Sequence, residues 1–123
     1  MRKQYFFRRS DSGLLAWDVD RLVQLSSGLP RKTIPLGAIR EIDQPWSGGD
    51  EPHTWRAMVE HMKLVEDADL SYPIILSVDG TVMDGMHRVA KAALQGRDSI
   101  EAVQFTVDPE PDHVNRGPAD LRY

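Results

Sequence analysis

The sequence contains no cysteine, which excludes disulfide bonds, thiolate metal sites and cysteine nucleophiles. It also lacks any run of about 20 apolar residues of the kind that spans a membrane. Near the start, basic residues flank only Tyr5, Phe6 and Phe7, a run too short for the apolar core of a signal peptide. We therefore expect a soluble cytoplasmic protein with no membrane partner.

An excess of positive charge is also missing. The 15 Lys and Arg residues are outnumbered by 19 Asp and Glu residues, which leaves a net charge of −4. Proteins that coat nucleic acid need a basic field that attracts phosphates. We therefore expect no sequence-independent binding to nucleic acid, although a local phosphate site is compatible with this charge.

The composition is that of one soluble globular domain. Its 123 residues are 41% apolar and 28% charged, and we find no internal repeat and no low-complexity tract. The sequence predicts one domain over residues 1–107. Residues 108–123 are rich in proline and predict an extended arm, ordered only if Leu121 and Tyr123 find a pocket.

The first half of the chain predicts two helices and one extended segment. Asp18 is a candidate N-cap for a short helix that ends near residue 27. Residues 32–42 read as extended, with Pro35 typical of an edge strand, and residues 43–52 as a loop. Residues 53–68 carry an apolar stripe at helical spacing, which we interpret as core packing: Trp55, Met58, Val59, Met62 and Val65.

The second half predicts a hairpin, a helix and a strand. Asp79-Gly80 is a strong hairpin signal between the apolar runs 72–78 and 81–83. A helix over residues 86–95 follows, ending at Gly96, and residues 100–107 form a last strand. The expected inner face of this helix consists of Met86, Val89, Ala90, Ala93 and Leu94. This order of elements indicates the α+β class.

The stretch Asp84-Gly85-Met86-His87-Arg88 lies at the expected junction of a strand and a helix. The first amides of a helix lack intrahelical partners, and the positive end of the helix dipole lies behind them. Gly85 permits an unusual backbone angle or a close ligand, while His87 and Arg88 add donors. Together they predict a phosphate site. The alternative is a structural turn in which Asp84 caps the helix and Arg88 pairs with a carboxylate.

Two stretches resemble the ParB/sulfiredoxin superfamily. The first is YPIILSVDGTVMDGMHRVAKAALQGRDSIEAVQF, with that superfamily's hairpin, glycine-containing turn, arginine at a helix start, small-residue helix and last strand. The second, KTIPLGAIREID, is similar to its opening strand. The resemblance covers residues 32–107 and implies a ParB/sulfiredoxin-like fold with a small mixed sheet flanked by helices.

Members of this superfamily differ at the turn. Sulfiredoxins have G-C-H-R and use the cysteine, which Met86 replaces here, so their repair chemistry is excluded. ParB proteins have G-E-R-R at this turn and bind CTP. We expect no helix-turn-helix domain in the sixteen residues after the match, and therefore no partition-type DNA loading. ParB-like free-serine kinases have D-G-H-H-R. Asp84, Gly85, His87 and Arg88 match it, which implies an adenine nucleotide with Mg²⁺ and a small hydroxyl acceptor.

Phosphoryl transfer needs carboxylates that hold Mg²⁺ and orient the acceptor. Glu41 and Asp43 are the candidate catalytic residues, because residues two apart on a strand point the same way. Asp50 and Glu51 are second candidates, with His53 beside them as a candidate base. The alternative for each is a solvated loop charge. No spacing of ligand residues predicts a zinc site.

These observations lead to hypotheses of different classes. The first is a nucleotide-binding protein in which residues 84–88 hold the phosphates of a nucleoside di- or triphosphate with Mg²⁺, and Glu41 or Asp43 serves a kinase or nucleotidase reaction. The second is a non-catalytic module for a nucleotide or a protein partner in DNA-related processes, with Trp46 and the 108–123 arm as contact surface. A third is that the fold persists while its ligand function has been lost.

Overall fold

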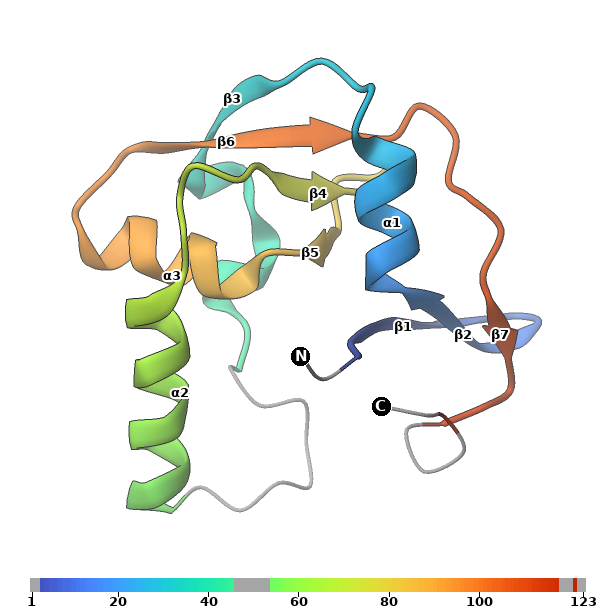
Figure 1. The fold of residues 1–123 in the computed structure, drawn as a ribbon, viewed down its shortest axis with the longest axis horizontal. Helices are drawn as coiled ribbons and strands as arrows, with labels where there is room; N and C mark the ends of the chain where they lie inside the picture. Colours follow the sequence, from blue (N-terminus) through green and yellow to red (C-terminus); the bar gives the residue numbers. More distant parts are fainter. Residues whose placement is uncertain (1–2, 46–53, 118–120, 122–123) are drawn as a thin grey trace.

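The computed structural model describes residues 3–45, 54–117 and 121, and all structural statements below concern these residues. They form two sheets, three α-helices and two short 3₁₀ turns (Figure 1). The elements are, in chain order, β1 (Tyr5–Ser10), β2 (Gly13–Asp18), α1 (Val19–Ser26), β3 (Lys32–Pro35), η1 (Leu36–Ala38), η2 (Arg40–Asp43), α2 (Trp55–Asp67), β4 (Ile74–Leu76), β5 (Val82–Asp84), α3 (Met86–Leu94), β6 (Ser99–Gln104) and β7 (His113–Val114).

The central sheet has the strand order β3-β6-β4-β5. β6 is parallel to β4, and the other two pairs are antiparallel, so the sheet is mixed. Pro35 ends β3 at the edge of the sheet, where its missing N–H costs no ladder hydrogen bond. The α+β class, the hairpin of β4 and β5, and a mixed sheet accompanied by helices are thereby confirmed.

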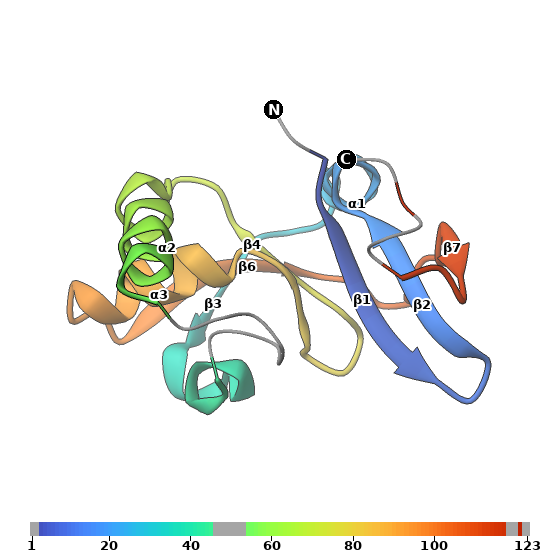
Figure 2. The same ribbon diagram turned by 90° about the horizontal axis from the view of Figure 1, so that it is seen from below.

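Both faces of the central sheet are covered because side chains alternate along each strand. Ile74 and Leu76 of β4 point into one apolar cluster, with Val89 and Ala92 of α3. Ile75, between them, points into a second cluster that includes Trp17, Leu22, Met83, Val103 and Phe105. Figure 2 shows α2 and α3 at one end of the molecule and the β1-β2-β7 sheet with α1 at the other.

The second sheet, β1-β2-β7, is not expected from the sequence and joins the two ends of the chain. β1 and β2 form an antiparallel hairpin, and β7 pairs with β2. Asn115 fastens the strands: its N–H donates to the Leu14 carbonyl at 2.7 Å and its Oδ1 accepts from the Leu14 N–H at 3.1 Å. This pairing links segments about a hundred residues apart, which no local pattern reveals.

The segment after β6, predicted as an extended arm, lies along the body of the protein. Trp17 Nε1 donates to the Pro109 carbonyl at 2.8 Å, and Arg21 Nη1 lies 2.9 Å from Asp112 Oδ1. Leu121 is buried, while Tyr123 lies outside the described residues. The arm is therefore packed on β2 and α1 through backbone and side-chain contacts.

The expectation that residues 32–42 are extended throughout is wrong. The strand ends at Pro35, and residues 36–38 and 40–43 form 3₁₀ turns. Leu36, Ile39 and Ile42 recur every three residues, which is the 3₁₀ period, so this winding turns all three toward the core. A strand would have pointed them to alternate faces.

The expectation that the apolar stripe along α2 is core packing is also wrong. The exposed fraction is 82% for Trp55, 44% for Met58, 63% for Val59 and 57% for Met62, and only Val65 is buried. A helix is present as expected, although it spans Trp55–Asp67 rather than residues 53–68, and its N-cap Thr54 accepts from the Ala57 N–H at 3.0 Å. Periodicity identified the helix but not the face that packs on the body.

The expected inner face of α3 is confirmed at Met86 and Val89, which pack on the core, and is wrong at Ala93 and Leu94. Val89 and Ala92 are buried, whereas Ala93 is exposed and Leu94 is 71% exposed. Ala92 and Ala93 are equally apolar, so composition alone did not distinguish them. The helix ends as predicted at Gly96, whose φ is 73°.

Candidate functional site

The turn between β5 and α3 begins a helix with a glycine in the left-handed region. Gly85 precedes α3 with φ of 111°, a conformation that favours glycine. Its carbonyl accepts from the Arg88 and Val89 N–H groups at 2.9 and 3.0 Å. The N–H groups of Met86 and His87 lie in the first turn of α3, where a helix offers them no acceptor. No side chain among the described residues caps α3 in place of such an acceptor.

Arg88 is held in place by two contacts. Its Nη2 lies 2.8 Å from Asp84 Oδ2, and its Nη1 donates to the Pro73 carbonyl at 3.1 Å. Both side chains of the ion pair are largely buried, at 15% exposure for Arg88 and 19% for Asp84. The expected structural role of Arg88 is therefore present, while Asp84 pairs with Arg88 rather than capping the helix. A guanidinium has five N–H donors, so Arg88 retains some for a ligand.

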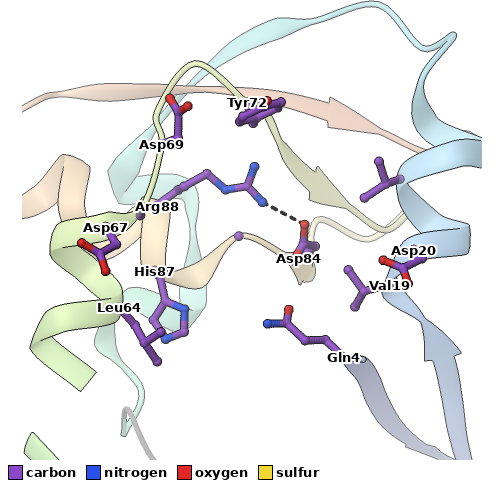
Figure 3. Close-up of a pocket in the computed structure, with 13 residues that line it drawn as sticks. Gln4, Val19, Asp20, Leu64, Asp67, Asp69, Tyr72, Asp84, His87 and Arg88 are labelled. Carbon is purple, nitrogen blue, oxygen red and sulfur yellow. Dashed lines mark hydrogen bonds and ion pairs between the residues drawn. The ribbon is translucent and has the colours of Figure 1, made fainter. Parts of the chain in front are cut away.

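This turn opens into a cavity of about 550 Å³ (Figure 3). Its walls come from α1, the carboxyl end of α2, the segment before β4, and the turn itself. Asp84, Gly85, His87 and Arg88 line it, which brings four of the five predicted phosphate-site residues together. Met86 instead packs against the core cluster beneath α3.

The cavity is acidic, which the sequence did not reveal. Three aspartates besides Asp84 line it: Asp20, Asp67 and Asp69. Asp69 accepts hydrogen bonds from Ser71 Oγ at 2.7 Å and from the Ser71 N–H at 2.9 Å, and these bonds lower the pKa of the Asp69 carboxyl. Within the described part of the chain, the Asp67 carboxylate has no hydrogen bond or ion pair. A bare phosphate entering here meets more carboxylates than cations, so an anionic ligand needs a counter-cation.

An apolar wall faces the turn across the cavity. Val19 and Val23 of α1 line it, together with Tyr72, which is 62% exposed. A second cavity of about 250 Å³ lies against the same Asp84–Arg88 pair and shares Val23 and Tyr72 with the first. The apolar wall and the start of α3 thus face the same cavity.

Glu41 and Asp43, the candidate catalytic residues, do not line this cavity. They lie on η2 rather than on a strand, so the premise that they point the same way fails. One carboxylate oxygen of Glu41, Oε2, accepts from the Val82 N–H at 2.7 Å, at the open edge of β5. The other oxygen, Oε1, is buried without a partner among the described residues. This placement indicates a role in closing the sheet edge.

The remaining candidates lie outside the described residues. Trp46, Asp50, Glu51 and His53 belong to the segment that the structure does not describe.

Asp67 and Asp69 are the carboxylates in the cavity wall that the sequence did not predict. Their signal was the acidic run EDAD between a helix and an apolar strand, which gives no indication that it faces the turn at residues 84–88.

His87 contacts a second histidine, His61 of α2, with ring centres 5.1 Å apart and planes inclined by 61°. Burial and the neighbouring His61 lower the pKa of His87, and Asp84 opposes this shift. His87 therefore favours its neutral form, with one donor and one acceptor nitrogen at neutral pH.

This shift predicts that the stability of the fold decreases as the pH falls from 7.5 to 5.5. The unfolded chain takes up the His87 proton below about pH 6.5, whereas the folded chain resists it, so acid favours unfolding. Urea unfolding at several pH values should show this slope in the wild type and a smaller slope in His87→Gln. His113→Gln, at the far sheet, is the matched control and should keep the wild-type slope. An unchanged slope in His87→Gln would contradict the assignment.

None of the described helices is long and apolar enough to cross a membrane. Among these residues, no group of three or more histidine or acidic side chains has the arrangement of a metal site. No family model, curated protein or solved structure matches the chain.

Proposed function

We propose that this protein is a nucleotide-binding domain of ParB/sulfiredoxin type, which holds a nucleoside di- or triphosphate with Mg²⁺ in the cavity at the start of α3. The observation that carries the proposal is the cavity of about 550 Å³, which joins an uncapped helix start, carboxylates and an apolar wall. This volume falls within the range of small-molecule sites.

The phosphates lie at the start of α3. There the N–H groups of Met86 and His87 are directed outward, and the positive end of the helix dipole favours a negative group. Arg88 is part of the same wall, and its unused N–H donors add charge-assisted hydrogen bonds. The largely buried ion pair with Asp84 keeps the guanidinium in one position, so little side-chain freedom is lost on binding.

Mg²⁺ supplies the counter-cation that the acidic cavity requires. The ion prefers oxygen ligands and is commonly bound by one or two carboxylates together with substrate phosphates. Asp67 and Asp69 provide such carboxylates beside the helix start (Figure 3).

The base lies against the apolar wall that Tyr72 forms with Val19 and Val23. Tyr72 is more than half exposed, so its ring face is available for stacking. This leaves the phosphates at the turn and the base toward α1.

Two activities are compatible with such binding. Mg²⁺-dependent phosphoryl transfer is the first, with Asp67 as the carboxylate whose oxygens are least committed. Binding without turnover is the second, and it is favoured by one observation: Glu41, expected to serve catalysis, is engaged with the Val82 N–H outside the cavity. Release of phosphate, or its transfer to a hydroxyl acceptor, distinguishes the two.

Calorimetric titration with ATP, ADP, CTP and GTP, with and without Mg²⁺, tests the proposal. We expect at least one nucleotide to bind the wild type, and Mg²⁺ to strengthen binding about tenfold, or about 1.4 kcal/mol. Asp67→Asn removes a carboxylate, so it should bind the Mg²⁺-free nucleotide more tightly and gain less from Mg²⁺. Asp98→Asn, outside the cavity, is the control. A folded wild type that binds none of the four nucleotides would refute the proposal.

A further inference from the structure

The α1 side of the cavity carries two polar side chains beside its apolar wall, Asp20 and Gln4. Asp20 directly follows Val19 and lies one helical turn before Val23, so it borders that wall. The Gln4 carbonyl accepts from the Val19 N–H at 3.0 Å, which holds the residue before β1 against the start of α1. Figure 3 shows Gln4, Val19 and Asp20 together on one side of the cavity, across from His87.

Both polar side chains are available to a ligand. The Gln4 amide has no hydrogen bond within the part of the chain that the structure describes. The Asp20 side chain is 78% exposed, and its ion pair with Lys3 is long, at 3.7 Å. The Lys3 ammonium lies closer to Asp18, at 2.8 Å. Asp20 therefore offers carboxylate oxygens, and Gln4 offers an amide group, on the α1 side of the cavity.

We propose that Asp20 and Gln4 bind the ribose hydroxyls of the nucleotide, an inference that rests on the proposed function, and that the cavity thereby selects ribonucleotides over 2′-deoxynucleotides. A carboxylate accepts hydrogen bonds and repels phosphate, so a hydroxyl suits the position beside Asp20 better than an anionic group does. Carboxylates bind the ribose 2′-hydroxyl in the same way in dinucleotide sites. The Gln4 amide, which both donates and accepts, fits a second hydroxyl.

The position of Asp20 agrees with the order of the groups in a nucleotide. The ribose joins the base to the phosphates, so it lies between the apolar wall and the start of α3. Asp20 is next to Val19 of that wall, and Gln4 extends into the same part of the cavity (Figure 3). Asp67 and Asp69 come instead from the end of α2 and the segment after it, so they remain for Mg²⁺.

Calorimetric titration with ATP, CTP and GTP and with their 2′-deoxy forms, all in the presence of Mg²⁺, tests the ribose contact. We expect the wild type to bind a ribonucleotide about tenfold more tightly than its 2′-deoxy form, because a hydrogen bond to a carboxylate is lost. Asp20→Ala should reduce this preference to about twofold, and Gln4→Ala should reduce it in part. Both side chains are exposed or nearly so, so folding should be preserved, which circular dichroism verifies.

Asp67→Asn is the matched control, because it removes a carboxylate from another wall of the same cavity. It should gain less from Mg²⁺ but keep the preference for ribose. If the wild type binds ribonucleotides and 2′-deoxynucleotides equally, the ribose contact is wrong while the nucleotide site stands. If Asp20→Ala keeps the preference, Asp20 does not contact the ribose, and a smaller gain from Mg²⁺ in that variant would make it a metal ligand instead. A wild type that binds none of these nucleotides would overturn the nucleotide site and the ribose contact together.

Discussion

Replacement of Gly85 by alanine is expected to lower the free energy of unfolding by about 3 kcal/mol. Two costs combine at this position. The backbone has φ of 111°, which a residue with a Cβ adopts only with strain, and the added Cβ would lie 2.6 Å from Ile74 Cγ2. Ile74 is fully buried in the core beneath α3, so it has no room to move aside.

Gly80→Ala is the matched control for this prediction. Gly80 also has a positive φ, of 87°, but nothing lies within 4 Å of the position that its Cβ would occupy. Only the strain remains there, and we expect a loss of about 1 kcal/mol. Urea unfolding of both variants measures the difference. Equal losses would show that the close approach to Ile74 is not what requires glycine at the turn.

Replacement of Arg88 by alanine is expected to reduce nucleotide affinity about a hundredfold and to lower the free energy of unfolding by about 2–3 kcal/mol. The first effect follows from the loss of the cation in the cavity wall. The second follows because Asp84, only 19% exposed, is left as a carboxylate without its partner. Calorimetry and urea unfolding measure the two effects.

A second substitution separates the two effects of Arg88→Ala. Adding Asp84→Asn removes the unpaired charge, so the double variant should recover part of the stability while nucleotide binding stays weak. Arg97→Ala, an exposed arginine outside this cavity, should change neither quantity beyond about 0.5 kcal/mol. If Arg88→Ala leaves both stability and binding unchanged, neither the ion pair nor the phosphate role of Arg88 holds.

Local signals in the sequence predicted most elements of residues 18–104. Asp18 does cap α1, accepting from the Asp20 N–H at 2.9 Å, and Asp79-Gly80 does join two antiparallel strands. The junction at Gly85 also lies where it was expected. These features depend on caps, turns and glycines acting within a few residues, so a single sequence suffices to predict them.

Non-local contacts account for what was missed. The β1-β2-β7 sheet depends on Leu15 pairing with Val114, nearly a hundred positions away. The turn into β2 does carry a signal, since Gly13 has φ of 111° and follows Asp11-Ser12, but two short runs of mixed residues gave too weak a pattern. Pairing of this kind is specified by partners across the fold rather than by neighbours.

The sequence by itself determined the α+β class, the positions of the helices and of the hairpin, and the strand–glycine–helix turn at residues 84–88. The tertiary structure decided what surrounds that turn. It placed Asp67 and Asp69 at the cavity and Glu41 at the edge of β5. It also left Trp55, Met58, Val59 and Met62 of α2 exposed to solvent. The physical reason is that a repeating apolar pattern defines a helix, whereas the face that is buried and the charges that converge depend on how distant segments pack.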